Sequence, residues 1–139
     1  MIYLRHAANA GVRGALANYV MEGPDGNGVP VSDRASDPLI SQWWAEVERL
    51  THVAAESGDV YALQALAIRY ENDPEQRDPR RSWAYWLAAN QMQVEVTGKP
   101  FLSFDRMAGA ITRSLSSEEI LLSEAMAGQL LKKIREKGK

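Results

Sequence analysis

The side chains best suited to acid–base or metal chemistry are few and lie far apart in the sequence. His6 and His52 are the only imidazoles, and cysteine is absent, so a thiol nucleophile or a cysteine-based zinc site cannot form. Glu46 and Glu48 are two residues apart, which directs them to different sides of a helix. No glycine-rich phosphate loop, GxSxG or HExxH motif occurs. We therefore expect no enzyme, metal or cofactor; a carboxylate-dependent hydrolase assembled from distant helices is the alternative.

Other residues with chemical potential have a structural interpretation that we favour. Asp25 and Asn27 resemble part of a calcium loop, but no glutamate stands at its twelfth position, so a turn is the better interpretation. Four tryptophans could stack on a base or a sugar, although aromatic residues at helical spacing usually fill a core: Trp43, Trp44, Trp83 and Trp86. Neighbouring Trp43 and Trp44 project about 100° apart on a helix, so one of them should be exposed. The terminal KKIREKGK suits the end of a helix dipole; contact with acidic lipid or nucleic acid is the alternative.

Composition limits the class of protein. The chain has 139 residues, 45% of them hydrophobic, and a formal net charge of -2. This length favours a single domain, and the charge gives no electrostatic basis for binding nucleic acid. No apolar run approaches the roughly 18 residues needed to span a bilayer, and Arg5 and His6 precede any signal-type run. As the sequence stands we expect a cytoplasmic protein, or a periplasmic one if the chain is a piece of a longer exported protein.

An internal repeat defines the elements that position these residues. The segment Ala7–Gly23 aligns without gaps with Ala54–Tyr70, an offset of 47 residues. The identical pairs are Ala7 and Ala54, Ala8 and Ala55, Gly11 and Gly58, Ala15 and Ala62, and Leu16 and Leu63. An alanine pair closes one helix, the glycine supplies a left-handed cap, and a small and a large residue open the next helix. The repeat therefore predicts pairs of antiparallel helices.

Capping residues predict where several helices begin. Asp37-Pro38 and Asp78-Pro79 each place an N-capping carboxylate before a proline at the first helical position. After the first, an apolar stripe follows at helical spacing: Leu39, Trp43, Val47, Leu50 and Val53. A capping box of Ser116 and Glu119 starts a last helix whose apolar residues are Ile120, Leu121, Ala127, Leu130, Leu131 and Ile134. Between these, we expect an irregular link over 92–100 and a helix over 101–113.

The best repeat has a pattern of small, acidic, leucine and aromatic residues at Ala54, Ala55, Gly58, Asp59, Ala62, Leu66, Ala67 and Tyr70 in its first helix, and at Asp78, Ser82, Tyr85, Trp86 and Ala89 in its second. This pattern resembles the Sel-one-like repeat, a relative of the tetratricopeptide repeat. The resemblance implies an all-α fold of antiparallel helix pairs stacked as a short α-solenoid with a C-terminal capping helix. Within a single domain of residues 1–139, we expect the end of a preceding repeat (1–10), a degenerate repeat (11–55) with a loop insertion (23–37), the best repeat (56–91), and degenerate and capping helices (92–139).

The resemblance also implies a function in outline. Such repeats generally act as adaptors or scaffolds that bind a protein or peptide on a concave surface lined by the first helix of each pair. The corresponding positions are Tyr61, Gln64, Ile68 and Glu71, and, in the earlier repeat, Gly14, Ala17, Met21 and Pro24. Exposed Tyr, Ile and Met would anchor a partner; packing of Ile68 and Met21 in the core is the alternative. The chain would be a module of a larger repeat protein or, alternatively, a small free-standing inhibitor or immunity-type protein that blocks its partner.

Overall fold

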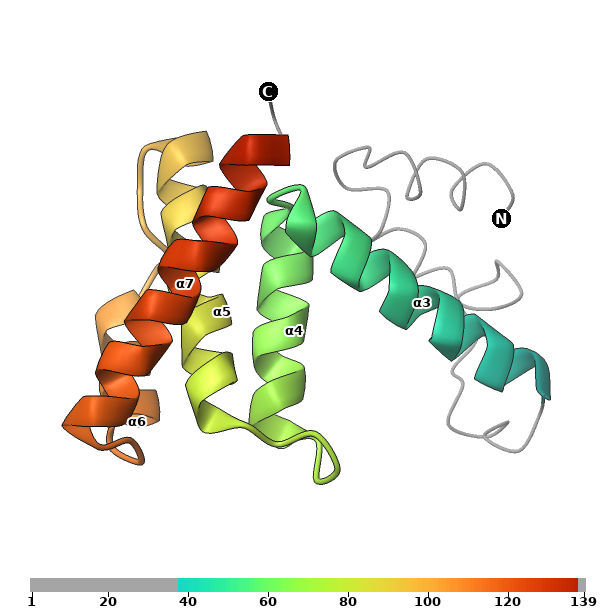
Figure 1. Ribbon diagram of the computed structural model, residues 1–139, viewed down its shortest axis with the longest axis horizontal. Helices are drawn as coiled ribbons and strands as arrows, with labels where there is room; N and C mark the ends of the chain where they lie inside the picture. The colour runs from blue at the N-terminus through green and yellow to red at the C-terminus, as the bar shows by residue number, and fades with distance from the viewer. Residues whose placement is uncertain (1–37, 138–139) are drawn as a thin grey trace. The chain divides into compact units, whose positions relative to one another are not determined.

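The computed structural model describes residues 38–137, and in this part of the chain all regular secondary structure is helical, without a strand (Figure 1). Its helices are α3 (Pro38–Glu56), α4 (Val60–Asn72), α5 (Pro79–Thr97), α6 (Phe104–Thr112) and α7 (Ser117–Lys137). The all-α expectation is confirmed for these residues. The expectations for 1–37, including the loop insertion and candidate residues Ala17 and Met21, lie outside the described residues. The chain divides into two compact units, Met1–Ala54 and Ala55–Lys139.

The described part of the first unit is helix α3 as far as Ala54, and the helix begins at Pro38 as the Asp-Pro signal predicts. Its apolar stripe is buried at Trp43, Val47 and Leu50. Trp44, one residue further along the helix, is 45% exposed, which confirms that the two neighbouring tryptophans differ in burial. Between the buried turns, the Thr51 hydroxyl donates a hydrogen bond of 2.6 Å to the Val47 carbonyl, so this buried polar group has a partner.

The second unit starts with a sharp turn at Gly58, whose φ of 85° lies in the left-handed region that the repeat predicts. A Cβ added there would lie 2.9 Å from Ile134 Cγ2 and 3.0 Å from Met92 Cε, so any larger residue would crowd these two side chains. Asp59 follows as the N-cap of α4 and accepts a hydrogen bond of 3.0 Å from the Ala62 amide. Glycine is therefore needed here for two independent reasons.

The antiparallel pair α4–α5 is built on small residues that let the two backbones approach closely. The buried set comprises Ala62, Leu63, Leu66 and Ala67 on α4, and Ser82, Trp83, Ala84, Trp86, Ala88 and Ala89 on α5. The buried Ser82 hydroxyl donates a hydrogen bond of 2.8 Å to the Ala67 carbonyl and so ties the helices together. Asp78 caps α5 by accepting from the Arg81 amide, as the second Asp-Pro signal predicts.

The expectation of an irregular link over 92–100 is wrong for its first six residues, because α5 continues to Thr97 and ends at Gly98 with φ 80°. Val94, Val96 and Thr97 disfavour a helix by local propensity. Contacts with residues distant in sequence compensate for this low propensity. Met92 lies against the turn at Gly58, and Glu95 accepts a hydrogen bond of 3.0 Å from Arg135 of α7. Tertiary packing thus extends this helix by more than a turn beyond the predicted end.

The short helix α6 begins at Phe104, three residues later than the sequence predicts. Its N-cap Ser103 is left-handed, with φ 61°, and makes no side-chain cap hydrogen bond, so the sequence offers no capping signal to locate the start. No residue of α6 is fully buried. Phe104 stacks on Trp83 with ring centroids 5.8 Å apart, and Met107, Ala108 and Ile111 pack beside it against the cluster that contains Trp86 and Leu115. The helix covers α5 with half-buried side chains.

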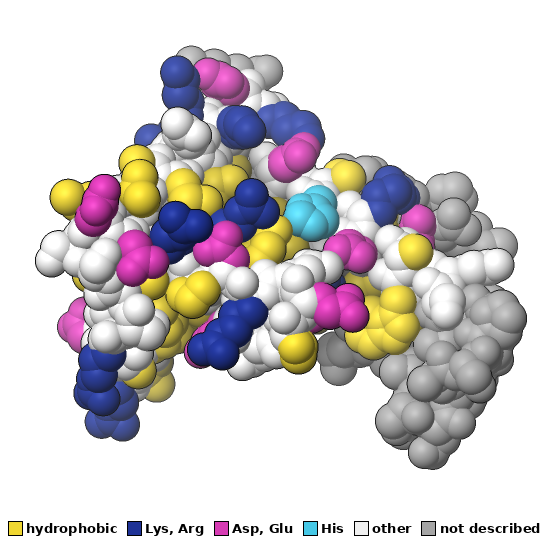
Figure 2. Space-filling model, turned by 60° about the horizontal axis from the view of Figure 1, so that its bottom comes forward, with side chains coloured by type: hydrophobic (Ala, Val, Ile, Leu, Met, Phe, Trp, Pro, Cys, Tyr) yellow, Lys and Arg dark blue, Asp and Glu magenta, His cyan; other side chains and the backbone are white. Residues whose placement is uncertain are grey.

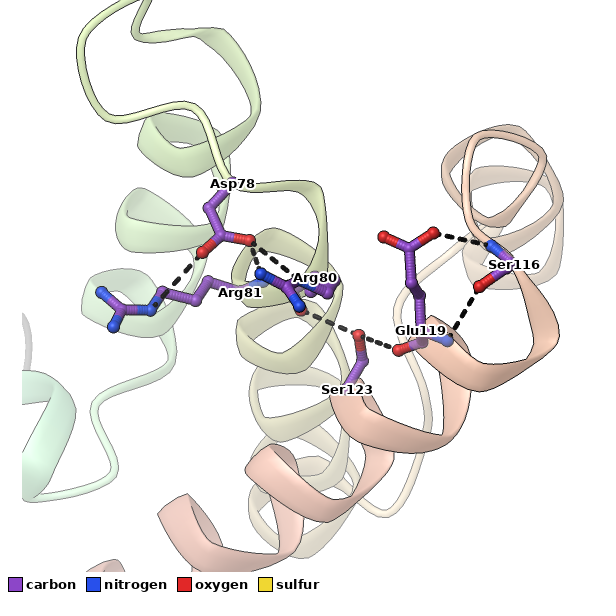
Figure 3. Close-up of polar contacts among 6 residues, drawn as sticks. All are labelled: Asp78, Arg80, Arg81, Ser116, Glu119 and Ser123. Carbon is purple, nitrogen blue, oxygen red and sulfur yellow. Dashed lines mark hydrogen bonds and ion pairs between the residues drawn. The ribbon is translucent and has the colours of Figure 1, made fainter.

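The last helix, α7, packs along α5 and starts at the predicted capping box. The Glu119 amide donates to Ser116 Oγ and the Ser116 amide donates to Glu119 Oε1, both at 3.1 Å (Figure 3). Ala127 and Ile134 are buried, as predicted, but Leu121 is 65% exposed. The expected apolar face is therefore narrower than the sequence suggests, because Leu121 lies about 100° around the helix from Ile120. None of the helices from α3 to α7 combines the length and the hydropathy that a membrane-spanning helix needs.

Candidate binding surfaces

The four residues predicted on the first helix of the best repeat share one side of α4. Tyr61 is 39% exposed, Ile68 is 46% exposed, Glu71 is exposed, and Gln64 is half-buried. We call this set the α4 face. The opposite side of the helix holds the buried residues that pair with α5. Ile68 is therefore available to solvent in this structure and does not fill the core, whereas Gly14, Ala17, Met21 and Pro24 lie outside the described residues.

Tyr61 presents a neutral phenol at one end of the α4 face. Partial burial raises the pKa of the Tyr61 hydroxyl above its usual value, and the nearby Asp59 carboxylate raises it further. The hydroxyl consequently remains protonated near neutral pH and can donate a hydrogen bond, while the ring offers apolar area. Tyr61 can thus act as an amphipathic anchor, which is the role that tyrosine commonly has in protein interfaces.

The second unit also contains three hollows in a row along α7, which the sequence does not predict. The central hollow, of about 140 Å³, is lined by Arg81, Tyr85, Met126, Gln129, Leu130 and Lys133. A hollow of about 250 Å³ is lined by Asp78, Arg80, Arg81, Leu122 and Met126. A third, of about 410 Å³, is lined by Glu56, Lys133, Glu136 and Lys137. Neighbouring hollows share Arg81 and Met126 on one side and Lys133 on the other, so together they form one track, the α7 groove.

Arg81 is held in the α7 groove by two neighbours. Its Nε lies 3.7 Å from Asp78 Oδ2 (Figure 3). Its guanidinium carbon lies 5.6 Å from the centroid of the Tyr70 ring. The same carboxylate caps α5 and lies 3.8 Å from the Nε of Arg80. A ring and a carboxylate thus restrain the guanidinium, which limits the conformational entropy that a bound ligand would have to remove.

The two walls of the α7 groove are joined at one end by Ser123. Its fully buried hydroxyl lies 2.9 Å from the Arg80 carbonyl of α5 and 2.9 Å from the Glu119 carbonyl of α7 (Figure 3). A single hydroxyl proton serves one of these carbonyls at a time. The contact brings the first turn of α5 against the second turn of α7, which positions Arg80 and Arg81 beside Leu122 and Met126.

Tyr85 supplies the aromatic side of the central hollow. It is half-buried and stacks on Tyr70 with ring centroids 5.6 Å apart. Burial raises the pKa of the Tyr85 hydroxyl, Tyr70 and Glu56 raise it further, and only Arg81 lowers it. The phenol is therefore neutral near physiological pH. The hollow combines a neutral aromatic ring and two apolar side chains with two cations, Arg81 and Lys133, and no carboxylate among its lining residues.

The described residues do not assemble a metal centre: within 38–137, no three or more His, Cys, Asp or Glu side chains are grouped so as to hold an ion. The face in Figure 2 carries Lys, Arg, Asp and Glu side chains interspersed with hydrophobic ones, without a broad area of a single charge sign. The repeat register predicts the α4 face. The α7 groove was not predicted, although Met126, Leu130 and Lys133 recur at helical spacing along its wall.

Comparison of the chain with protein-family models, with curated proteins and with solved structures found no match. The resemblance to Sel-one-like repeats therefore remains a prediction from the residues, as does their stacking into a solenoid. Two surfaces of the chain itself, the α4 face and the α7 groove, are the candidates for binding.

Proposed function

We propose that the chain is a protein-binding module, an adaptor or scaffold element that holds another protein or a peptide on the α4 face. The single observation that supports this proposal is the exposure of Tyr61 and Ile68 on one side of a helix whose other side is completely buried. Large apolar side chains that the core does not use represent surface available for binding. The sequence pattern of the repeat nominates the same positions independently.

The composition of the α4 face fits a protein interface. Aromatic and aliphatic anchors provide most of the binding free energy when a partner removes them from water, and polar neighbours at the rim add orientation. Here Tyr61 and Ile68 are the anchors, and Gln64 and Glu71 supply an amide and a carboxylate beside them. The four lie on successive turns over Tyr61–Glu71, a helical rise of about 15 Å, which suits contact with one helix or one extended segment.

The test compares capture of native partners by three purified forms of the chain. The wild type, the Tyr61→Ala/Ile68→Ala variant and a Leu102→Ala/Leu121→Ala control, whose two residues line none of the hollows, are immobilised in turn, and the retained proteins are quantified by mass spectrometry. Both pairs are large exposed hydrophobic residues, so the control matches the loss of apolar surface.

We expect a partner that the wild type and the control retain equally and the α4 variant loses. Its affinity, measured again with the purified partner, should fall about tenfold or more when both anchors are truncated. Circular dichroism and the unfolding midpoint of each variant establish that it is folded. Equal retention of every partner by all three forms contradicts the proposal.

A further inference from the structure

We propose that the α7 groove is a second binding site, specific for an extended acidic peptide segment that carries a large apolar side chain. The site does not depend on the α4 face, because none of Tyr61, Gln64, Ile68 and Glu71 lines any of its three hollows. Its occupant is identified by the arrangement of charge along the groove, by the size of the central hollow and by the length of the track.

Charge varies along the groove in a way that selects a carboxylate at its centre. At one end Asp78 lies close to Arg80 and Arg81, and at the other Lys137 Nζ lies 3.0 Å from Glu56 Oε2, so each end carries carboxylates as well as cations. The central hollow has Arg81 and Lys133 but no carboxylate. Lys133 has no ion-pair partner among the described residues, and Arg81 has a 54% exposed side chain. An acidic side chain placed there would lie beside Lys133 and beside Arg81, which also contacts Asp78.

The central hollow also has room for one apolar side chain. An engineered cavity of about 150 Å³ holds benzene, so a hollow of about 140 Å³ matches one leucine or phenylalanine side chain. Tyr85, Met126 and Leu130 form its apolar lining. The thioether of Met126 is flexible and polarisable, which lets it adapt to different apolar side chains. A drug-sized molecule generally needs about 300 Å³ or more, so the hollow alone is small for one.

The length of the groove indicates a short segment of chain. From Leu122 to Lys137 the axis of α7 rises by about 22 Å, which an extended peptide covers with about seven residues. A single nucleic-acid strand could have a similar length, but the carboxylates of Asp78, Glu56 and Glu136 interrupt the cations at the two ends, so the groove lacks a continuous row of positive charge for phosphates. The mixed ends and the apolar centre together favour an acidic peptide over nucleic acid.

The test uses fluorescein-labelled heptapeptides and fluorescence anisotropy with the full chain. The acidic probe carries a central leucine flanked by glutamates; one comparison probe replaces the glutamates with glutamines, another replaces the leucine with alanine, and a third is a single-stranded oligothymidine. The variants are Lys133→Gln and its matched control Lys132→Gln, which removes the same charge from the adjacent position of α7 and lies outside the groove lining. The Tyr61→Ala/Ile68→Ala variant is included to separate this site from the α4 face.

We expect the wild type to bind the acidic probe. Its affinity for the glutamine probe and for the alanine probe should each be lower by about fivefold or more. Lys133→Gln should weaken binding of the acidic probe about fivefold, whereas Lys132→Gln and Tyr61→Ala/Ile68→Ala should stay within about twofold of wild type. The proposal is overturned by an equal loss with Lys132→Gln, by loss with the α4 variant, by tighter binding of the oligothymidine, or by no binding of the acidic probe at about 1 mM protein. Failure of the α4 proposal leaves this outcome unaffected.

Discussion

The helix pair α4–α5 and the segment α6–α7 are stabilised in different ways, although both belong to the same compact unit. The pair buries a continuous set of small and large residues, and four of them on α4 alone are completely inaccessible to solvent. The segment has no buried residue in α6 and only Ser123, Ala127 and Ile134 in α7. It is attached through these few buried residues, through half-buried side chains and through ion pairs at the surface.

This difference indicates where stability and recognition reside. Completely buried surface contributes about 25 cal/mol per Å² of apolar area, so the α4–α5 interface should dominate the free energy of unfolding. Half-buried side chains contribute less, but they leave the hollows that a ligand can fill. The α7 groove occurs along the less complete interface, at the side chains that the α5–α7 contact leaves partly exposed, such as Met126 and Leu130.

The largest effect should come from truncating the centre of the α4–α5 interface. Leu66→Ala removes a completely buried side chain and leaves a cavity, which should lower the free energy of unfolding by about 2–5 kcal/mol. The matched control Leu102→Ala makes the same chemical change at a side chain that is 98% exposed, and should change the free energy by less than about 0.5 kcal/mol. Chemical denaturation followed by circular dichroism measures both. Similar losses for the two variants would remove the distinction between the regions.

A smaller effect should distinguish the two left-handed glycines. Gly98→Ala meets no atom within 4 Å and should cost only the strain of the backbone, about 1–2 kcal/mol. Gly58→Ala has the same strain, and its Cβ also approaches Ile134 and Met92, which adds about 1 kcal/mol or more. The difference between the two unfolding free energies isolates the contact of α7 and α5 with this turn. A Gly58 variant no less stable than the Gly98 variant would show that these side chains move aside at no cost.

The smallest effect should come from the surface contact between α5 and α7. The hydrogen bond from Arg135, followed by that from Gln91, lowers the pKa of the Glu95 carboxyl below its usual value. A lowered folded-state pKa stabilises the fold above the unfolded-state pKa and loses that contribution as the pH falls through the folded-state value. Arg135→Gln should therefore return the Glu95 titration towards its usual range, with little change in the unfolding midpoint because both groups are exposed.

NMR titration of the Glu95 carboxyl carbon measures this shift directly. Lys132→Gln on the same helix serves as the control, because it removes a cation that makes no contact with Glu95. Arg135→Gln should raise the Glu95 pKa and the control should leave it near the wild-type value. Equal shifts in the two variants would mean that general charge, and not the specific hydrogen bond, perturbs Glu95.

Local signals in the sequence predicted much of the helical framework. The Asp-Pro pairs located the starts of α3 and α5, the Ser116–Glu119 box located the start of α7, and the repeat register located the left-handed turn at Gly58. These signals work because they act within one turn of the residue concerned. The end of α5 and the start of α6 were misplaced, since Met92 and Glu95 are stabilised by partners distant in sequence and Ser103 makes no cap hydrogen bond.

The two candidate surfaces also differ in how far the sequence predicts them. The residues of the α4 face follow from the repeat spacing alone, because positions three and four apart share a side of any helix. The α7 groove requires Arg81 and Tyr85 of α5 to lie beside Met126 and Lys133 of α7, about 40 residues or more further along the chain. The sequence by itself thus determined the helices, their caps and the faces they carry. Only the tertiary structure decided which faces meet and which hollows stay open, because packing between helices depends on side-chain shape over distances that no local pattern records.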